Sequence, residues 1–84
     1  MYQVKVTKTA EKQLDKIPNN YYLLITAKLK KLEFDPRPSG CKKLVGYDDI
    51  YRIRVGNYRV IYTINDNVLI VEIIKVGTRQ SIYD

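Results

Sequence analysis

The sequence predicts an α+β fold with an N-terminal strand, a helical hairpin and then an antiparallel β-meander. Apolar residues recur at helical spacing in the first half of the chain, whereas from residue 42 onward they fall in strands joined by short turns. Helices followed by a run of hairpin-connected strands are typical of α+β folds. At 84 residues and 45% hydrophobic content, residues 1–84 are expected to form one domain with one modest core.

The first expected element is a strand over "YQVKV", residues 2–6, in which apolar and polar side chains alternate. A short helix follows, with Thr9 as its expected N-cap and Glu11 near its positive end. One side of this helix is apolar and carries Ala10, Leu14 and Ile17. Pro18 ends it, because proline cannot continue a helix.

The second helix is expected to begin at Asn19 or Asn20 and to cover "YYLLITAKLKKLEF". Its apolar stripe comprises Tyr21, Ile25, Leu29 and Leu32. The lysines of this segment fall largely off the stripe and should face water. The segment "DPRPSG" ends the helix, because Pro36 and Pro38 cannot continue it and Gly40 suits a turn.

Three segments rich in apolar and β-branched residues make up the second half: "IYRIRV", "YRVIYTI" and "VLIVEIIKV". The first two are separated by Gly56-Asn57, and the last two by a turn signal that begins with Asn65-Asp66-Asn67. These segments predict two consecutive hairpins, which form the meander.

A two-residue loop at Gly56-Asn57 fixes the register of the first hairpin, so that Val55 faces Tyr58 and Arg54 faces Arg59. The two-residue period of a strand then separates two faces. The inner face is apolar and aromatic and comprises Tyr51, Ile53, Val55, Tyr58, Val60 and Tyr62. The outer face carries three arginines, Arg52, Arg54 and Arg59.

This arginine-rich outer face has two interpretations. Opposed like charges destabilise a hairpin by roughly 0.2–1 kcal/mol per cross-strand pair, so folding alone gives no reason for them. The functional interpretation is an anion cradle, because the planar guanidinium group suits phosphate. The ordinary alternative is a solvated sheet face whose repulsion is screened by salt. With 15 Lys and Arg against 9 Asp and Glu, the net charge of +6 makes nucleic acid the first candidate partner. Charge alone is equally compatible with a soluble protein that happens to be basic.

Residues near the end of the sequence extend this expectation. Gly77 can turn the chain so that Arg79 converges on the same outer face, since the end of the last strand of a meander lies near the start of the strand that carries Arg59. Tyr83 is expected either to stack on a nucleobase or to pack on the sheet.

Other features carry less functional information. The single Cys41 has no histidine to activate it, since the chain contains none, and is interpreted as structurally incidental. Asp48 and Asp49 are candidates for a catalytic base, but a solvated turn is the favoured interpretation. No apolar run approaches the roughly 20 residues of a membrane span, and the first residues lack an apolar signal segment. We therefore expect a cytoplasmic protein without membrane association.

Three segments, "DPRPSGCKKLVG", "YRIRVGNYRVIY" and "VGTRQSIYD", resemble in order and spacing the toxins of RelE-type bacterial and archaeal toxin–antitoxin modules, within the RelE/ParE superfamily. The resemblance covers nearly the whole chain and implies a single domain with the RelE-like fold. It also implies an mRNA interferase, a metal-independent endoribonuclease without a cofactor that cuts mRNA in the ribosomal A site. The implied partners are the ribosome with its mRNA and a cognate antitoxin.

The resemblance further implies which residues act. The 2′-hydroxyl of the RNA attacks the adjacent phosphate, which gives a 2′,3′-cyclic phosphate and a 5′-hydroxyl. The aligned catalytic residues are Arg52, Arg54, Arg59, Arg79 and Tyr83. We expect four lysines to contribute to RNA binding: Lys28, Lys31, Lys42 and Lys43.

The sequence also departs from the family pattern. Several relatives have lysine where Arg52 or Arg54 stands, and many have histidine where Thr78 stands. Arginine, with a pKa above about 12, cannot serve as a base near neutral pH. Three alternatives follow: catalysis is mostly electrostatic and positional, another group fills the acid–base role, or the activity is weak or absent. The alternative function is a ParE-like toxin that inhibits DNA gyrase and cuts nothing, and a third is a decayed RNA-binding relic.

Overall fold

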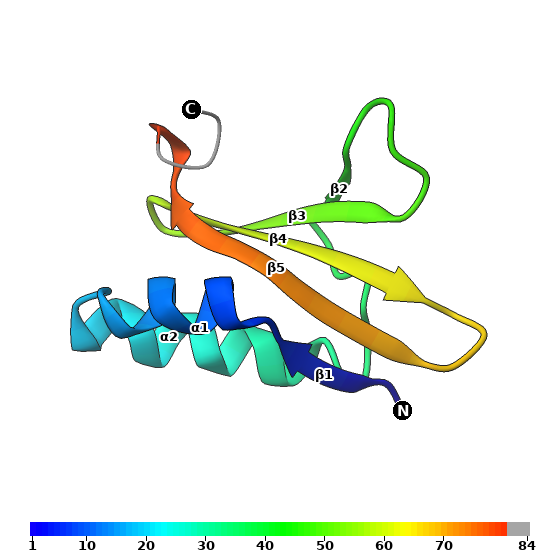
Figure 1. Cartoon of the computed structure of the whole chain (residues 1–84), viewed down its shortest axis with the longest axis horizontal. Coiled ribbons are helices and arrows are strands. Elements are labelled where there is room, and N and C mark those ends of the chain that lie inside the picture. The colour runs from blue at the N-terminus through cyan, green and yellow to red at the C-terminus, as the bar shows by residue number, and fades with distance from the viewer. Residues whose placement is uncertain (81–84) are drawn as a thin grey trace.

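The computed structural model describes residues 1–80, which form a five-stranded sheet with two helices on one face (Figure 1). The elements in chain order are β1 (Gln3–Val6), α1 (Lys8–Asp15), α2 (Asn19–Lys31), β2 (Lys42–Lys43), β3 (Ile50–Val55), β4 (Tyr58–Asn65) and β5 (Ile70–Thr78). The strand order is β1-β5-β4-β3-β2. Strands β2 to β5 are antiparallel neighbours, which confirms the predicted α+β meander, and β1 joins β5 in parallel.

The first helix begins two residues earlier than the sequence predicted. Its N-cap is Thr7, whose hydroxyl accepts a hydrogen bond from the Ala10 backbone N–H at 3.2 Å, so the expectation for Thr9 was wrong. Thr7 also donates its own backbone N–H to the carbonyl oxygen of Ile73 at 3.1 Å. One residue therefore ends the β1–β5 pairing and starts α1, and Thr9 lies within the first turn. Glu11 is in that turn as predicted.

The second helix begins at Asn19, as predicted, but ends at Lys31 rather than continuing through residue 34. After Lys31 the chain tightens into turns in which Leu32 and Phe34 donate to carbonyl oxygens three residues earlier, at 3.1 Å in both cases. The predicted apolar stripe does face the core. Three of its members, Ile25, Leu29 and Leu32, are buried, and Tyr21 is half-buried.

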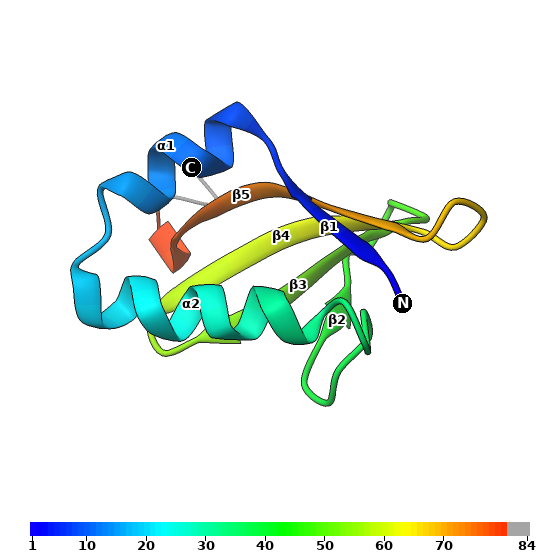
Figure 2. The same cartoon turned by 90° about the horizontal axis from the view of Figure 1, so that it is seen from below.

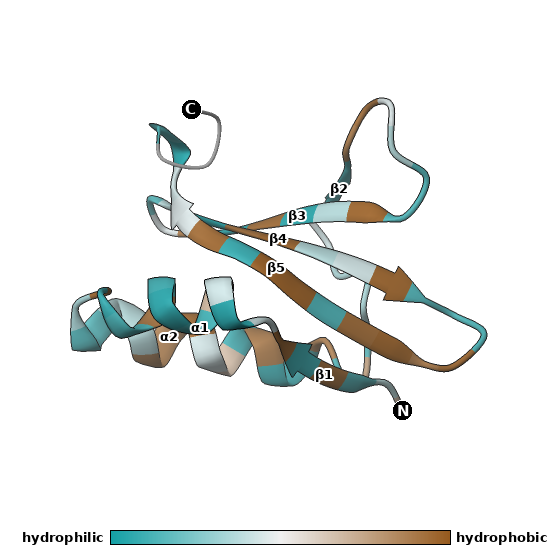
Figure 3. Ribbon diagram, viewed as in Figure 1, coloured by the Kyte–Doolittle hydropathy of each residue, from teal (hydrophilic) through white to brown (hydrophobic). Residues whose placement is uncertain are grey.

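The core lies between the helices and the inner face of the sheet. Figure 2 shows both helices crossing that face, with α1 near β5 and α2 below β3 and β4. Figure 3 shows hydrophobic and hydrophilic residues alternating along much of β5. The largest fully buried side chains are Tyr62, Ile25, Leu32, Ile73, Val60, Val71 and Val76. Within residues 1–80, neither helix is long and apolar enough to cross a membrane.

The first hairpin has the predicted register, in which Val55 pairs with Tyr58 and Arg54 with Arg59. Gly56 has a φ of +60°, as the first central residue of a type II′ turn requires. A Cβ at this glycine would lie 3.3 Å from a ring carbon of Tyr21. The Tyr21 ring also packs against Tyr58, with ring centroids 5.1 Å apart. The tip of the hairpin is therefore held against α2.

Candidate functional site

Five cationic side chains from three parts of the chain line one pocket, which has a volume of about 330 Å³. Its cationic lining consists of Lys28, Lys31, Lys42, Arg52 and Arg54, and we call it the basic pocket. The remaining wall comes from the loop before β2 and from the edge of β3, through Pro38, Ser39, Gly40 and Ile53. All five cationic residues are predicted site residues: the three lysines were expected to bind RNA and the two arginines to act in catalysis.

Local structure explains how these side chains meet. Lys28 and Lys31 are three residues apart on α2 and so project from the same side of the helix. Both lie in the last turn, where the helix dipole favours cations. Lys30, between them, lines a different groove. Lys42 pairs directly with Arg52 across the β2–β3 ladder, so the short β2 strand carries the third lysine to the arginines.

Arg59 and Arg79 lie at the hairpin end of the sheet and are not part of the lining of the basic pocket. Arg59 is half-buried, is the direct cross-strand partner of Arg54, and donates to the Tyr58 carbonyl oxygen at 3.4 Å. Thr78, the last residue of β5, pairs with Tyr58. The exposed Arg79 follows it directly, which matches the predicted approach of the two strand ends.

Other predicted residues do not join this group. Lys43 pairs with Tyr51, is exposed and is not part of the lining of the basic pocket. Asp48 and Asp49 are also exposed and contribute nothing to that lining. Tyr83 lies outside the described residues, so its role stays a prediction.

Sequence reasoning assigned no role to Arg37, which is the centre of a network that supports the site. Its guanidinium group donates to both carboxylate oxygens of Asp66, at 2.9 and 3.2 Å, and to the Tyr51 hydroxyl at 3.3 Å. It also lies 5.2 Å from the centre of the Tyr51 ring. Tyr2 donates its hydroxyl to the same carboxylate. We call these four residues the Arg37–Asp66 network.

This network joins the loop that walls the basic pocket to β3 and to the β4–β5 turn. The hydrogen bond from Arg37 holds the pKa of Asp66 below its usual range, and the carboxylate raises the pKa of Arg37. The hydrogen bond to Asp66 also raises the pKa of Tyr2. No local sequence pattern predicts the contact between Arg37 and Asp66, because 29 residues separate them.

The same loop is anchored to the core by Tyr62. Its hydroxyl donates to the Pro36 carbonyl oxygen at 2.7 Å, and burial raises the pKa of the phenol well above its usual value. Cys41 is a free, half-buried thiol packed against the core. Among residues 1–80, no three His, Cys, Asp or Glu side chains are grouped so that they could hold a metal ion.

Comparison with known proteins identifies the family to which the chain belongs. The profile of the ParE toxin family of type II toxin–antitoxin systems, parDE, matches residues 4–83. The chain is a toxin of the RelE/ParE superfamily. Toxin RelE3 of Methanocaldococcus jannaschii is 49% identical over 43 residues, which span 51% of this toxin and 47% of that protein. This local match therefore covers about half the length of that relative.

Solved structures extend the similarity to nearly the whole toxin. The archaeal RelE–RelB complex from Pyrococcus horikoshii contains a chain that is 35% identical, with a TM-score of 0.84 and coverage of 93% of this toxin and 94% of that chain. The intact Escherichia coli RelBE toxin–antitoxin complex gives 28% identity and a TM-score of 0.82, with coverage of 93% and 96%. The toxin therefore has the RelE-like fold that its sequence predicted.

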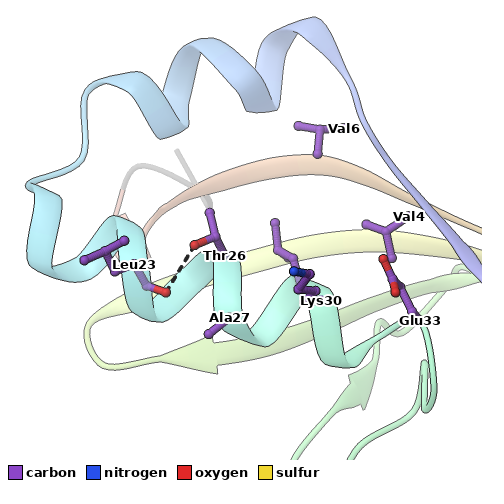
Figure 4. A pocket seen from close by; sticks show the side chains of 8 residues that line it. Val4, Val6, Leu23, Thr26, Ala27, Lys30 and Glu33 are labelled. Atoms are coloured by element: carbon purple, nitrogen blue, oxygen red, sulfur yellow. Dashed lines mark hydrogen bonds between the residues drawn. The ribbon is translucent and has the colours of Figure 1, made fainter.

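A second surface of the toxin is an apolar groove of about 460 Å³ between β1 and α2. Figure 4 shows Val4 and Val6 approaching it from β1, and Leu23 and Ala27 from α2. Lys30 and Glu33 lie toward the end of the helix and add one charge of each sign. The groove is lined mainly from α2 and β1, whereas the basic pocket lies at the opposite edge of the sheet, beside β2 and β3. We call it the α2–β1 groove.

Proposed function

We propose that this type II toxin is a ribosome-dependent endoribonuclease that cuts mRNA in the ribosomal A site. The observation that carries the proposal is the basic pocket, in which Arg52 and Arg54 meet three lysines, with Arg59 paired to Arg54 beside it. A concentration of fixed cations at one sheet edge suits an RNA phosphodiester better than any neutral ligand. RelE-named relatives and complexes support the same assignment.

In the proposed reaction the 2′-hydroxyl oxygen of the RNA forms a bond to the adjacent phosphorus, and the bond to the 5′-oxygen breaks. The products are a 2′,3′-cyclic phosphate and a 5′-hydroxyl end, and one proton passes from the nucleophile to the leaving oxygen. Because the substrate supplies the nucleophile, no metal-bound hydroxide is needed. The phosphorane carries more negative charge than the ground state, so guanidinium groups held close to it lower the barrier.

The residues divide between electrostatic and proton-transfer roles. Arg54 and Arg59 are the proposed phosphate contacts, with Arg79 and Tyr83 completing the site on the C-terminal side. Arginine keeps its proton near neutral pH, whereas a lysine ammonium can donate one. The lysines of the basic pocket are therefore the proposed proton relay, with Lys42 nearest to Arg52 in the ladder. One ammonium group protonates the leaving 5′-oxygen, and the amine that results takes up the proton lost by the 2′-hydroxyl.

Primer extension on mRNA incubated with translating ribosomes tests the proposal. The wild type should produce cuts with 5′-hydroxyl ends only when ribosomes are present, and Arg59→Ala should reduce the cleavage rate by about 10²- to 10³-fold. Lys31→Ala and Lys30→Ala form a matched pair, because adjacent lysines of one helix line the basic pocket and the α2–β1 groove respectively. Intact mRNA with wild-type toxin, or equal losses in the two lysine variants, would contradict the assignment.

A ParE-like gyrase inhibitor is the second candidate. Two observations favour it: the matching profile is that of the ParE family, and the chain contains no histidine to act as a base. A supercoiling assay with purified gyrase decides between the candidates. Inhibition by the toxin, together with intact mRNA on ribosomes, would replace the nuclease proposal.

We also propose that a cognate antitoxin silences the toxin by binding the α2–β1 groove. The Pyrococcus horikoshii and Escherichia coli structures described above are toxin–antitoxin complexes, and the groove presents exposed apolar side chains beside the open edge of β1. Leu23 is 58% exposed and lines the groove, whereas Leu24 is 56% exposed and does not. Leu23→Glu should weaken antitoxin binding in a titration, and Leu24→Glu should not. Equal affinities of both variants would place the antitoxin elsewhere.

A further inference from the structure

The face of the sheet opposite the helices carries an apolar pocket that the proposed reaction does not use. Its volume is about 520 Å³, and its lining includes Tyr47, Ile50, Ile61, Ile74 and Lys75. We call it the Tyr47 pocket. Ile61 is only 7% exposed, although neither helix covers this face. Neighbouring side chains on this face must therefore cover Ile61, and they form the walls of the pocket.

A β-bulge helps to build this pocket. The register between β4 and β5 shifts after Ile61, which pairs with Lys75, whereas Tyr62 pairs with Ile73. Ile74 is therefore the additional residue on β5. In a regular strand Ile74 and Lys75 would point to opposite faces, but here both line the same pocket. Bulges commonly re-aim a side chain next to a functional site.

The connection between β2 and β3 forms the other wall. Figure 1 shows it rising from the sheet on the side away from the helices. Two hydrogen bonds keep it folded: Leu44 N–H donates to the Ile50 carbonyl oxygen at 2.9 Å, and Tyr47 N–H donates to the Leu44 carbonyl oxygen at 3.3 Å. The Tyr47 side chain is 57% exposed. Tyr47 therefore presents an accessible aromatic ring in the lining of the pocket.

The pocket lies next to an arginine of the outer face. Ile61 pairs with Arg52 on one side and with Lys75 on the other, so a cation flanks it on both neighbouring strands. Arg59 lies two residues earlier on β4, on the same face, at a distance of about 6.6 Å along the strand. Apolar surface in the pocket and cationic side chains therefore lie next to one another on this face.

We propose that the Tyr47 pocket receives one unpaired nucleobase of the RNA strand whose phosphates contact Arg52, Arg54 and Arg59. The inference deepens the proposed function, because it takes RNA as the ligand of the outer face. Proteins that bind single strands combine a cationic track with aromatic platforms for the bases, and this face provides both. The cations on both sides of Ile61 favour a polyanion over a neutral apolar peptide as the occupant.

A binding cycle without ribosomes tests the inference. The probe is a fluorescein-labelled, unstructured oligoribonucleotide, with a second version that carries one abasic site at its centre. Fluorescence anisotropy gives the Kd of each RNA for the wild type and for Tyr47→Ala. Tyr47→Phe keeps the ring and is the conservative variant, and Tyr22→Ala removes a partly exposed tyrosine on α2 outside the pocket.

Tyr47→Ala should weaken binding of the intact RNA by about 5- to 150-fold, the range reported by alanine substitution at base-stacking residues. The loss should largely disappear with the abasic RNA, because the two changes remove the same contact. Tyr47→Phe and Tyr22→Ala should bind nearly as the wild type does. The salt dependence should be unchanged in Tyr47→Ala and should fall by about one charge in Arg54→Ala.

Each failure has a separate signature. Equal affinities of wild type and Tyr47→Ala for the intact RNA, with both proteins folded by circular dichroism, would overturn the nucleobase site even if mRNA is cleaved on ribosomes. The expected coupling without any ribosomal cleavage would leave the base pocket standing and overturn the nuclease. Weaker antitoxin binding by Tyr47→Ala, with unchanged RNA binding, would assign the pocket to the protein partner.

Discussion

The two faces of strands β3 to β5 differ in what they contribute. The inner face is apolar and fully packed, with Val60, Tyr62 and Ile73 each 0% exposed. The outer face opposes Arg54 to Arg59 and places Lys75 beside Ile61. Folding explains the inner face, whereas the outer face keeps like charges that folding does not favour. The difference indicates that stability and recognition occupy opposite sides of the same strands.

The largest expected effect separates the two faces on adjacent residues of β5. Ile73→Ala should lower the free energy of unfolding by about 2–5 kcal/mol, because it leaves a cavity in the core. Ile74→Ala should cost clearly less, because the Ile74 side chain is only half-buried on the outer face. Urea denaturation monitored by circular dichroism gives both values. Equal losses would remove the distinction between the faces.

The hairpin tip, which packs against Tyr21 of α2, provides the next test. Gly56→Ala should lower stability by about 1–2 kcal/mol, since it forces alanine to a φ of +60°. The new methyl group would also approach the Tyr21 ring. Gly46→Ala is the control, because Gly46 also has a positive φ but nothing lies within 4 Å of its added Cβ. Gly56→Ala should lower the midpoint temperature of thermal unfolding more than Gly46→Ala does.

A smaller effect of opposite sign is expected on the outer face. Arg54→Gln should raise the free energy of unfolding by roughly 0.2–1 kcal/mol, because it removes the repulsion with Arg59. The same change should weaken RNA binding. Arg54→Lys keeps the charge and should show neither gain in stability nor a comparable loss of binding. A destabilised Arg54→Gln variant would mean that the arginine supports the fold.

The smallest effect concerns the Arg37–Asp66 network and depends on pH. The pKa of Asp66 is lowered in the folded state, so its contribution to stability is present above the unfolded pKa of about 3.9 and is lost as pH falls through the folded value. Wild type should exceed Asp66→Asn in stability by a constant amount above about pH 5. The difference should shrink in more acid solution. A difference that persists there would exclude an ionic origin.

Local patterns predicted much of the fold. The Gly56-Asn57 turn and the two-residue strand period correctly gave the register of the first hairpin and the separation of its faces. The helical spacing correctly gave the buried stripe of α2. The Thr9 cap was wrong because Thr7 is bonded to β5 through Ile73, a contact that lies 66 residues away in the sequence and has no local signal.

The sequence by itself determined which side chains lie on each face of the hairpin, because neighbouring residues and a two-residue turn set that geometry. Only the tertiary structure decided that Lys28 and Lys31 of α2 reach Arg52 and Arg54, and that β1 joins β5 in parallel. It also decided the bulge at Ile74 and the Arg37–Asp66 network. These contacts join segments distant in the chain, and their geometry follows from how the helices pack on the twisted sheet.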